Sequence, residues 1–141
     1  MFYQLPPAGN TIRLTPGHKD VDGAMRLFRP WRTAWYDSGT SALAAAVSAA
    51  VSLKKIGSPE VLLPAYGCPD LISAVLYAGA NPVLIDLEPE RPWMDLDMLA
   101  SRISENTVAV VAVDLFGIPE RFDELRKIST QAGVMLIEDS A

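Results

Sequence analysis

The sequence predicts an α/β fold with three layers, in which a mainly parallel sheet lies between two layers of helices. Short apolar runs alternate along the chain with amphipathic stretches of helical length, a pattern typical of βαβ units. The run Val108–Val113 is apolar at every position, as expected for a strand that is covered on both faces. The apolar runs end on prolines or acidic residues, which indicate the carboxyl ends of strands.

Composition restricts the class of protein. The chain has 141 residues, half of them apolar, and no run approaches the roughly 18 apolar residues of a membrane span. Residues 1–7 lack the basic and apolar regions of a secretory signal, and the single cysteine excludes an internal disulfide. The net charge of -5 comes without a basic cluster, which argues against nucleic-acid and membrane partners. We therefore expect a cytoplasmic protein.

Residues 1–32 are predicted to form an extended arm. Prolines and glycines recur in this segment, and the only periodicity is a possible short helix near Val21–Phe28. We expect the arm to lie over another part of the protein or over a partner subunit. His18 is interpreted as a surface residue and not as a ligand or catalytic base.

The regular pattern begins at residue 33. Thr33–Tyr36 can form a brief strand, and apolar residues at helical spacing predict a helix over Ser41–Lys55, with Gly57 as its stop. Val61–Leu63 follows as a short buried strand that ends at Pro64. The remaining expected elements are a helix from Pro69 to Gly79, a strand at Val83–Ile85, a helix from Asp95 or Asp97, the strand Val108–Val113, a helix at Glu120–Gln131 and a strand at Val134–Ile137.

Residues 33–141 are expected to form one partial domain. The alternation of strands and helices predicts parallel strands with right-handed crossovers. The sequence stops at Glu138–Ala141, directly after a buried strand, which would leave an uncovered sheet edge. We therefore expect this region to be the N-terminal part of a larger fold, truncated after the strand that leads to Asp139, or to depend on a partner.

The turn before the first helix is a candidate anion site. A glycine-containing turn that opens a helix directs backbone N–H groups and the positive end of the helix dipole toward one point. The hydroxyls of Ser38, Thr40 and Ser41 can cap the helix, bind an anion, or do both. Taken alone, such a turn is more typical of an ordinary capped helix start than of an anion site.

Other polar residues are expected near this turn, because ligands of open α/β sheets bind beyond the carboxyl ends of the strands. A carboxylate in such a position can cap a turn, bind a metal or pair with a protonated ring nitrogen. No cluster of histidines and cysteines accompanies the acids, so no metal site is expected. The candidate segments are Asp37–Thr40, Pro64–Cys68, Asp86, Asp114–Gly117 and Glu138–Ser140.

The order of these segments resembles the DegT-type sugar aminotransferases, which are fold-type-I enzymes that use pyridoxal 5'-phosphate (PLP). The resemblance covers about residues 33–141 and implies the N-terminal half of an aspartate-aminotransferase-like large domain. The segments that carry it are Ser38–Leu43, Val61–Tyr66, Ala74–Asp86, Asp114–Gly117 and Ile137–Ala141.

The resemblance implies a set of cofactor-binding residues. Gly39, Thr40 and Ser41 match the turn that binds the PLP phosphate in the family. Asp139 matches the acid that keeps the pyridine nitrogen protonated, because a neighbouring negative charge raises the pKa of a cation. The phosphate and the ring would then be held by residues from opposite ends of this region.

The sequence also departs from the family pattern. Gly67 and Cys68 replace a threonine and the aromatic residue that stacks on the cofactor ring, so Tyr66 is the candidate to stack instead. Cys68 either faces the ring or is a buried, inert thiol. Asp114 occupies the position of the usual histidine, and its role is left open.

The family's Schiff-base lysine would lie some tens of residues beyond Asp139, and no lysine of this chain is expected to replace it. Lys54 and Lys55 fall at the far end of the first helix, Lys127 on an outer helix face and Lys19 in the arm. The sequence therefore contains no candidate catalytic residue, and we expect this chain alone to be inactive.

The favoured interpretation is a truncated, PLP-dependent aminotransferase-like protein of the nucleotide-sugar type, in which a complete enzyme transfers an amino group from a donor such as glutamate to a keto sugar. The alternative is a non-catalytic α/β module that acts by self-association. A doubly wound nucleotide-binding protein is disfavoured, because the sequence contains neither a GxGxxG motif nor a P-loop. The family's sites lie at subunit interfaces, so we expect a homodimer or a larger assembly.

Overall fold

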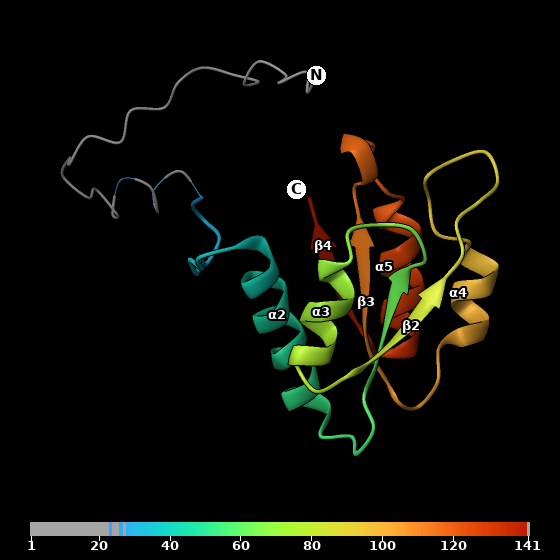
Figure 1. The fold of residues 1–141 in the computed structure, drawn as a ribbon, viewed down its shortest axis with the longest axis horizontal. Helices are drawn as coiled ribbons and strands as arrows, with labels where there is room; N and C mark the ends of the chain where they lie inside the picture. Colours follow the sequence, from blue (N-terminus) through green and yellow to red (C-terminus); the bar gives the residue numbers. More distant parts are fainter. Residues whose placement is uncertain (1–22, 24–25, 27, 141) are drawn as a thin grey trace, which may run out of the picture. The chain divides into compact units, whose positions relative to one another are not determined.

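The computed structural model describes residues 23, 26 and 28–140, and the chain divides into two compact units, Met1–Ala34 and Trp35–Ala141. The second unit contains the sheet and the helices that cover it (Figure 1). Most of the predicted arm, with His18 and most of the possible helix at Val21–Phe28, lies outside the described residues. Within the described residues, no helix combines the length and apolarity needed to cross a membrane.

The sheet of the second unit has four parallel strands in the order β2-β1-β3-β4. Their bounds are β1 Glu60–Pro64, β2 Asn81–Ile85, β3 Thr107–Val113 and β4 Met135–Asp139. The predicted α/β class with a parallel sheet is confirmed. The four predicted strands after residue 60 each begin within two residues of an observed strand start.

Helices cover both faces of this sheet. Helices α2 (Gly39–Lys54) and α3 (Asp70–Tyr77) pack on one face, while α4 (Leu96–Arg102) and α5 (Phe122–Ala132) pack on the other (Figure 1). A short 3₁₀ turn, η1 (Leu115–Gly117), follows β3. The structure therefore has the three layers that the sequence predicts.

The apolar run of β3 supplies both layers of the core. Ala109 and Val111 join the cluster beneath α2 and α3, whereas Val110 and Ala112 join the cluster beneath α4 and α5. All of them are fully buried, which explains why this strand has no polar face. The register between β1 and β3 shifts at Glu60, so that Val108 joins the same cluster as Ala109.

The predicted strand at Thr33–Tyr36 is wrong. Residues 32–36 have no regular secondary structure, and Trp35 and Tyr36 are more than half exposed. The sequence of this segment has high β propensity, but a strand also needs a neighbouring strand to hydrogen-bond with, and the sheet pairs only β1 to β4 here. Helix α2 begins two residues earlier than predicted, at Gly39.

The connections place a topological switch between β1 and β3. The chain passes from β1 through α3 to β2 on one side, and from β3 through α5 to β4 on the other. Because the strands are parallel, their carboxyl ends meet at one edge of the sheet, beside the start of α2. Such an edge is where open α/β sheets bind ligands.

Candidate functional site

Helix α2 begins with a hydroxyl cap. The Ser38 Oγ accepts a hydrogen bond of 3.1 Å from the Ser41 N–H and lies 2.9 Å from the Ser41 Oγ. Ser38 itself is extended, as an N-cap residue requires. The amides of Gly39 and Thr40 precede the first bonded turn of the helix, so the helix itself does not use them. The cap therefore leaves anion-binding donors at the helix start.

A cleft of about 190 Å³ joins this helix start to the end of β4. It brings Gly39 and Thr40 together with Asp139, which lies about a hundred residues further along the chain. The Thr40 hydroxyl donates a 3.2 Å hydrogen bond to Asp70 Oδ2 at the start of α3. The lining residues are Gly39, Thr40, Leu43, Cys68, Asp70, Leu71 and Asp139.

Asp139 is a half-buried acid at the carboxyl end of β4. Burial raises the pKa of its carboxyl group, and the negative charge of Asp114 raises that pKa further. Both causes disfavour the ionised form when the cleft holds no cation. A cation beside Asp139 would reverse the balance, because it would compensate the buried charge.

Asp114 connects the ends of β3 and β4. Its backbone N–H donates to the Asp139 carbonyl oxygen over 3.1 Å. Its Oδ1 accepts from the Glu120 N–H at 3.0 Å, and its Oδ2 accepts from the Ser140 hydroxyl at 2.9 Å. Both oxygens of this acid are therefore fixed, which is a role that the sequence alone did not indicate.

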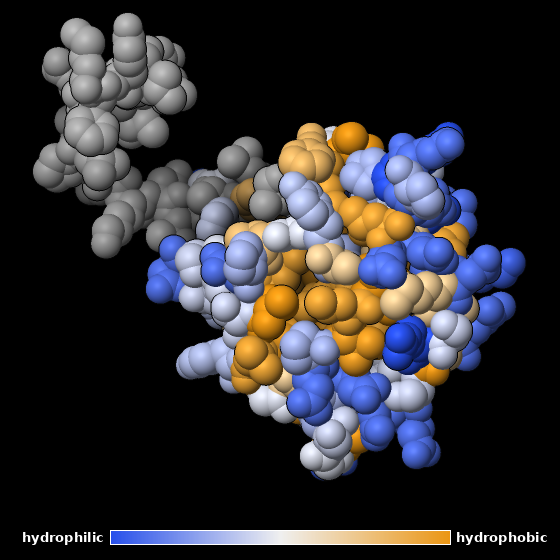
Figure 2. Space-filling model, turned by 45° about the vertical axis from the view of Figure 1, so that its right-hand side comes forward, coloured by the Kyte–Doolittle hydropathy of each residue, from blue (hydrophilic) through white to orange (hydrophobic). Residues whose placement is uncertain are grey.

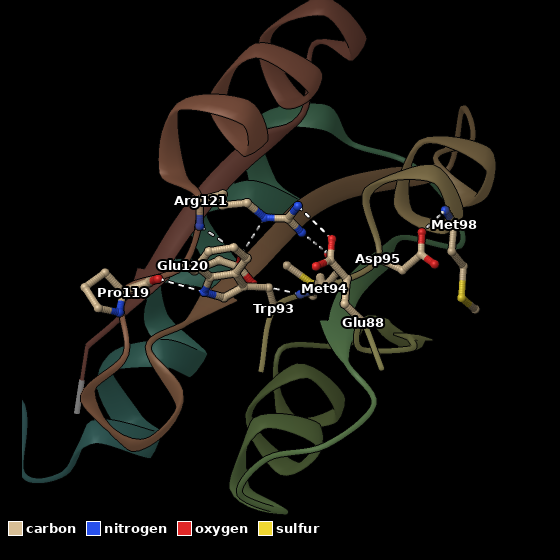
Figure 3. A network of polar contacts seen from close by, with 8 residues as sticks. All are labelled: Glu88, Trp93, Met94, Asp95, Met98, Pro119, Glu120 and Arg121. Carbon is tan, nitrogen blue, oxygen red and sulfur yellow. Dashed lines mark hydrogen bonds and ion pairs between the residues drawn. The ribbon is translucent and has the colours of Figure 1, made fainter. Parts of the chain in front are cut away.

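Glu120, whose N–H donates to Asp114, is a buried acid that belongs to a second polar network (Figure 3). The Glu120 carboxylate, which is almost fully buried, accepts hydrogen bonds from the Met94 N–H at 2.9 Å and the Arg121 N–H at 2.8 Å. Arg121 in turn pairs with Glu88 at 2.7 Å and donates to the Met94 carbonyl oxygen at 2.7 Å. We call this set of contacts the Glu120–Arg121 clasp.

Trp93 extends the clasp to the loop after β3. Its indole N–H donates to the Pro119 carbonyl oxygen over 2.9 Å, and the guanidinium groups of Arg91 and Arg121 lie 4.7 and 4.9 Å from the ring centre. The clasp thereby ties the segment before α4 to the segment before α5 (Figure 3). Sequence reasoning missed these residues, because adjacent acidic and basic residues at a helix start are usually solvated.

The other predicted site residues lie at the margin of the cleft or outside its lining. Ser41 lines a neighbouring groove of about 450 Å³ together with Thr40. Tyr66 is exposed and lies 6.2 Å, ring centre to ring centre, from Phe116. Cys68 lines the cleft and is exposed, so the expectation of a buried thiol is wrong. At Gly67 a Cβ atom would lie 3.0 Å from the end of the Leu71 side chain, so a larger residue needs that side chain to move.

The described lysines are remote from the cleft. Lys54 Nζ donates to the Thr107 carbonyl oxygen over 2.7 Å, at the amino end of β3 and thus at the opposite edge of the sheet. Lys55 ends α2 in a left-handed conformation, and Lys127 is exposed on α5. None of the lysines that the structure describes lines the cleft.

The raised pKa of Asp139 predicts a pH-dependent penalty on folding. A carboxyl group with a higher pKa in the folded state binds more protons when folded, so the free energy of unfolding falls as pH rises through that pKa. At pH values above the pKa of folded Asp139, the folded chain carries the full free-energy cost of the ionised Asp139 carboxylate. We therefore expect Asp139→Asn to raise the free energy of unfolding at neutral pH, with the gain shrinking as the pH falls through the raised pKa and absent below about pH 4.

Urea denaturation of the ligand-free chain across this pH range measures the effect. Glu105→Gln, at an exposed acid, is the matched control and is expected to change stability little at any pH. A lower stability of Asp139→Asn at neutral pH would contradict the expected cost of the charge.

Comparison with known proteins places this site in a family. The model of the DegT/DnrJ/EryC1/StrS aminotransferase family matches residues 33–141. UDP-2-acetamido-2-deoxy-3-oxo-D-glucuronate aminotransferase of Pseudomonas aeruginosa is 32% identical over 58% of this chain and 23% of its own length. UDP-N-acetyl-3-dehydro-alpha-D-glucosamine 3-aminotransferase of Acidithiobacillus ferrooxidans is 32% identical over 74% of this chain and 27% of its own length.

A solved structure shares the fold as well. NtdA of Bacillus subtilis, solved with bound cofactor PMP, is 26% identical with a TM-score of 0.62, over 72% of this chain and 23% of its own. This chain thus spans about a quarter of the length of the relatives it matches. The match to the family model over most of the chain confirms the resemblance seen in the sequence. The chain belongs to the DegT/DnrJ/EryC1/StrS aminotransferase family.

Proposed function

We propose that this chain supplies the phosphate-binding and ring-binding part of a PLP site, in an aminotransferase that acts on a nucleotide-linked keto sugar. The observation that carries the proposal is the single cleft between the α2 start and Asp139. The sugar substrate is proposed because both curated relatives are named as aminotransferases of UDP-linked sugars. An amino donor such as glutamate and a cytoplasmic location remain predictions.

The residues of the cleft fit the charges of this cofactor. The Gly39 and Thr40 amides and the helix dipole favour the phosphate, and Asp139 favours a protonated ring nitrogen. Asp70 carries a negative charge in the same cleft, but it is solvent-exposed and accepts the Thr40 hydroxyl. Its repulsion of a phosphate is therefore screened by water and salt.

When bound, the cofactor supplies an electron sink for amino transfer. Asp139 would hold the proton on the ring nitrogen, which is what makes the ring an electron sink. Leu43 and Leu71 form apolar walls of the cleft, and the partial burial of Asp139 strengthens its interaction with a cation. We therefore assign cofactor binding, and not proton transfer at the substrate, to these residues.

The position of the lysines supports the alternative function. Since no described lysine lines the cleft, a non-catalytic module that keeps the fold and acts by self-association remains the second candidate. Cofactor binding separates the two, because a module without a cofactor has no reason to prefer a phosphorylated ligand.

We further propose that the chain forms a homodimer or a larger assembly. Leu76 on α3 is 57% exposed and Leu84 on the edge strand β2 is 44% exposed. One face of the molecule carries an apolar patch bordered by hydrophilic side chains (Figure 2). Sedimentation of the chain at micromolar concentration is expected to show dimers or larger species. A single monomeric species would contradict the assembly.

The Gly39 amide allows a direct test of phosphate binding. Gly39→Pro removes this N–H group, and proline is well tolerated because residue 39 is the first helical residue and Ser38 is extended. We expect it to weaken pyridoxamine phosphate binding about tenfold, the loss of one hydrogen bond to a charged group. Isothermal titration of the 141-residue chain measures the affinity.

The matched control is Gly39→Ala, which keeps the amide and adds a Cβ atom that meets no protein atom within 4 Å. Pyridoxamine, which lacks the phosphate, is expected to bind more weakly than its phosphate and to be insensitive to Gly39→Pro. Equal binding of the two ligands to the unaltered chain would refute the phosphate site.

A further inference from the structure

We propose that Asp114 is a positioning residue for Asp139, whose fixed carboxylate adds a second negative charge so that the cleft selects a protonated heteroaromatic ring over a neutral one. This inference rests on the proposed function and deepens it. Asp114 is not among the residues that line the cleft, so it acts through Asp139 and not on the ligand itself.

The strand pairing brings the two acids to the ends of neighbouring strands. In the parallel register of β3 and β4, Val113 lies opposite Asp139, and the next amide, that of Asp114, donates to the Asp139 carbonyl oxygen over 3.1 Å. The Asp114 side chain is oriented by the Glu120 N–H, which donates to one oxygen, and by the Ser140 hydroxyl, which is shared between the other oxygen and Glu138. Asp114 therefore holds its charge near the end of β4.

Among the residues that the structure describes, no ion pair joins a basic side chain to either of these two acids. Glu138 adds a third acid on β4, joined to Asp114 through the shared Ser140 hydroxyl, and Asp70 lines the cleft on the α3 side. Arg121 forms its ion pairs with Glu88 and Glu120 instead. The Cys68 thiol and the positive start of α2 are the other polar groups of the cleft that bear on Asp139. A ring cation would thus be the compensating charge.

The mutual influence of the two acids supports this view. Burial raises the pKa of Asp139, and the charge of Asp114 raises it further, as expected for two acids at neighbouring strand ends. A cation bound at Asp139 is attracted by both charges, whereas a neutral ring gains nothing from Asp114. The second charge thus favours the cationic ring specifically.

The Glu120–Arg121 clasp accounts for the rigidity of Asp114. Glu120 makes contacts in both directions. Its N–H donates to Asp114, and its carboxylate accepts from the Met94 and Arg121 N–H groups (Figure 3). The Glu120–Arg121 clasp thereby helps to orient the Asp114 side chain.

Asp114→Asn tests the role of the charge, because asparagine can still accept the Glu120 N–H. The probes are pyridoxamine phosphate and its 1-deaza analogue, in which a C–H group replaces the ring nitrogen, titrated against the 141-residue chain. We expect the variant to bind pyridoxamine phosphate about fivefold more weakly and the deaza analogue within about twofold of the unaltered chain. Asp114→Glu, which keeps the charge, is expected to restore part of the preference.

Two further variants separate charge from structure. Asp86→Asn removes an acid at the end of β2, outside the cleft, and is expected to leave both affinities unchanged. Ser140→Ala frees one oxygen of Asp114 but keeps its charge. It is expected to weaken the binding of pyridoxamine phosphate by less than Asp114→Asn does, and to leave the binding of the deaza analogue unchanged. Circular dichroism establishes that each variant is folded, and Ser140→Ala tests the inference even where Asp114→Asn does not fold.

The outcomes distinguish this inference from the proposed function. If Asp114→Asn weakens both probes equally, or neither, while the unaltered chain binds pyridoxamine phosphate, Asp114 has only a structural role and the inference is overturned alone. If the unaltered chain does not bind pyridoxamine phosphate, the proposed function fails and the inference fails with it.

Discussion

The parallel pairing of β1 with β3 is the constraint on which the rest of the structure depends. It fixes the direction of the central strands, and the outer strands β2 and β4 then pair in the same direction. All carboxyl ends therefore meet at one edge, where the start of α2 also lies. Residues far apart in the sequence, such as Gly39 and Asp139, line one cleft for this reason.

The cleft combines a positive end, at the start of α2, with a negative end, at Asp139. The start of α2 contributes the positive end of a helix dipole, while Asp139 contributes negative charge and Asp114 adds a second acid outside the lining. Asp139 makes folding less favourable when nothing is bound, since its charge is partly buried and near that of Asp114. A ligand with an anionic and a cationic end would relieve this cost, which is how function and stability are coupled here.

Much of this arrangement could be predicted from the sequence. The apolar run of β3 indicated the correct layers, and the glycine-containing turn at Gly39 indicated the start of α2 to within two residues, because both depend on local pattern. Asp139 was found through the family pattern. The strand expected at Thr33–Tyr36 failed because pairing depends on distant residues, which a propensity does not report.

The remaining features depend on contacts that no spacing records. The clasp joins Met94 and Glu120, which are far apart in the sequence and meet only because α4 and α5 pack on the same face of the sheet. The side chain of Tyr66 lies against Phe116, an orientation set by the conformation of the loop after β1. The two oxygens of Asp114 find their partners only after β3 and β4 have paired.

A crystal structure of the chain with pyridoxamine phosphate tests the central claim most directly. The account predicts the phosphate within hydrogen-bonding distance of the Gly39 and Thr40 amides and the ring nitrogen beside the Asp139 carboxylate. A phosphate bound away from the start of α2, or a ring nitrogen turned away from Asp139, would contradict it.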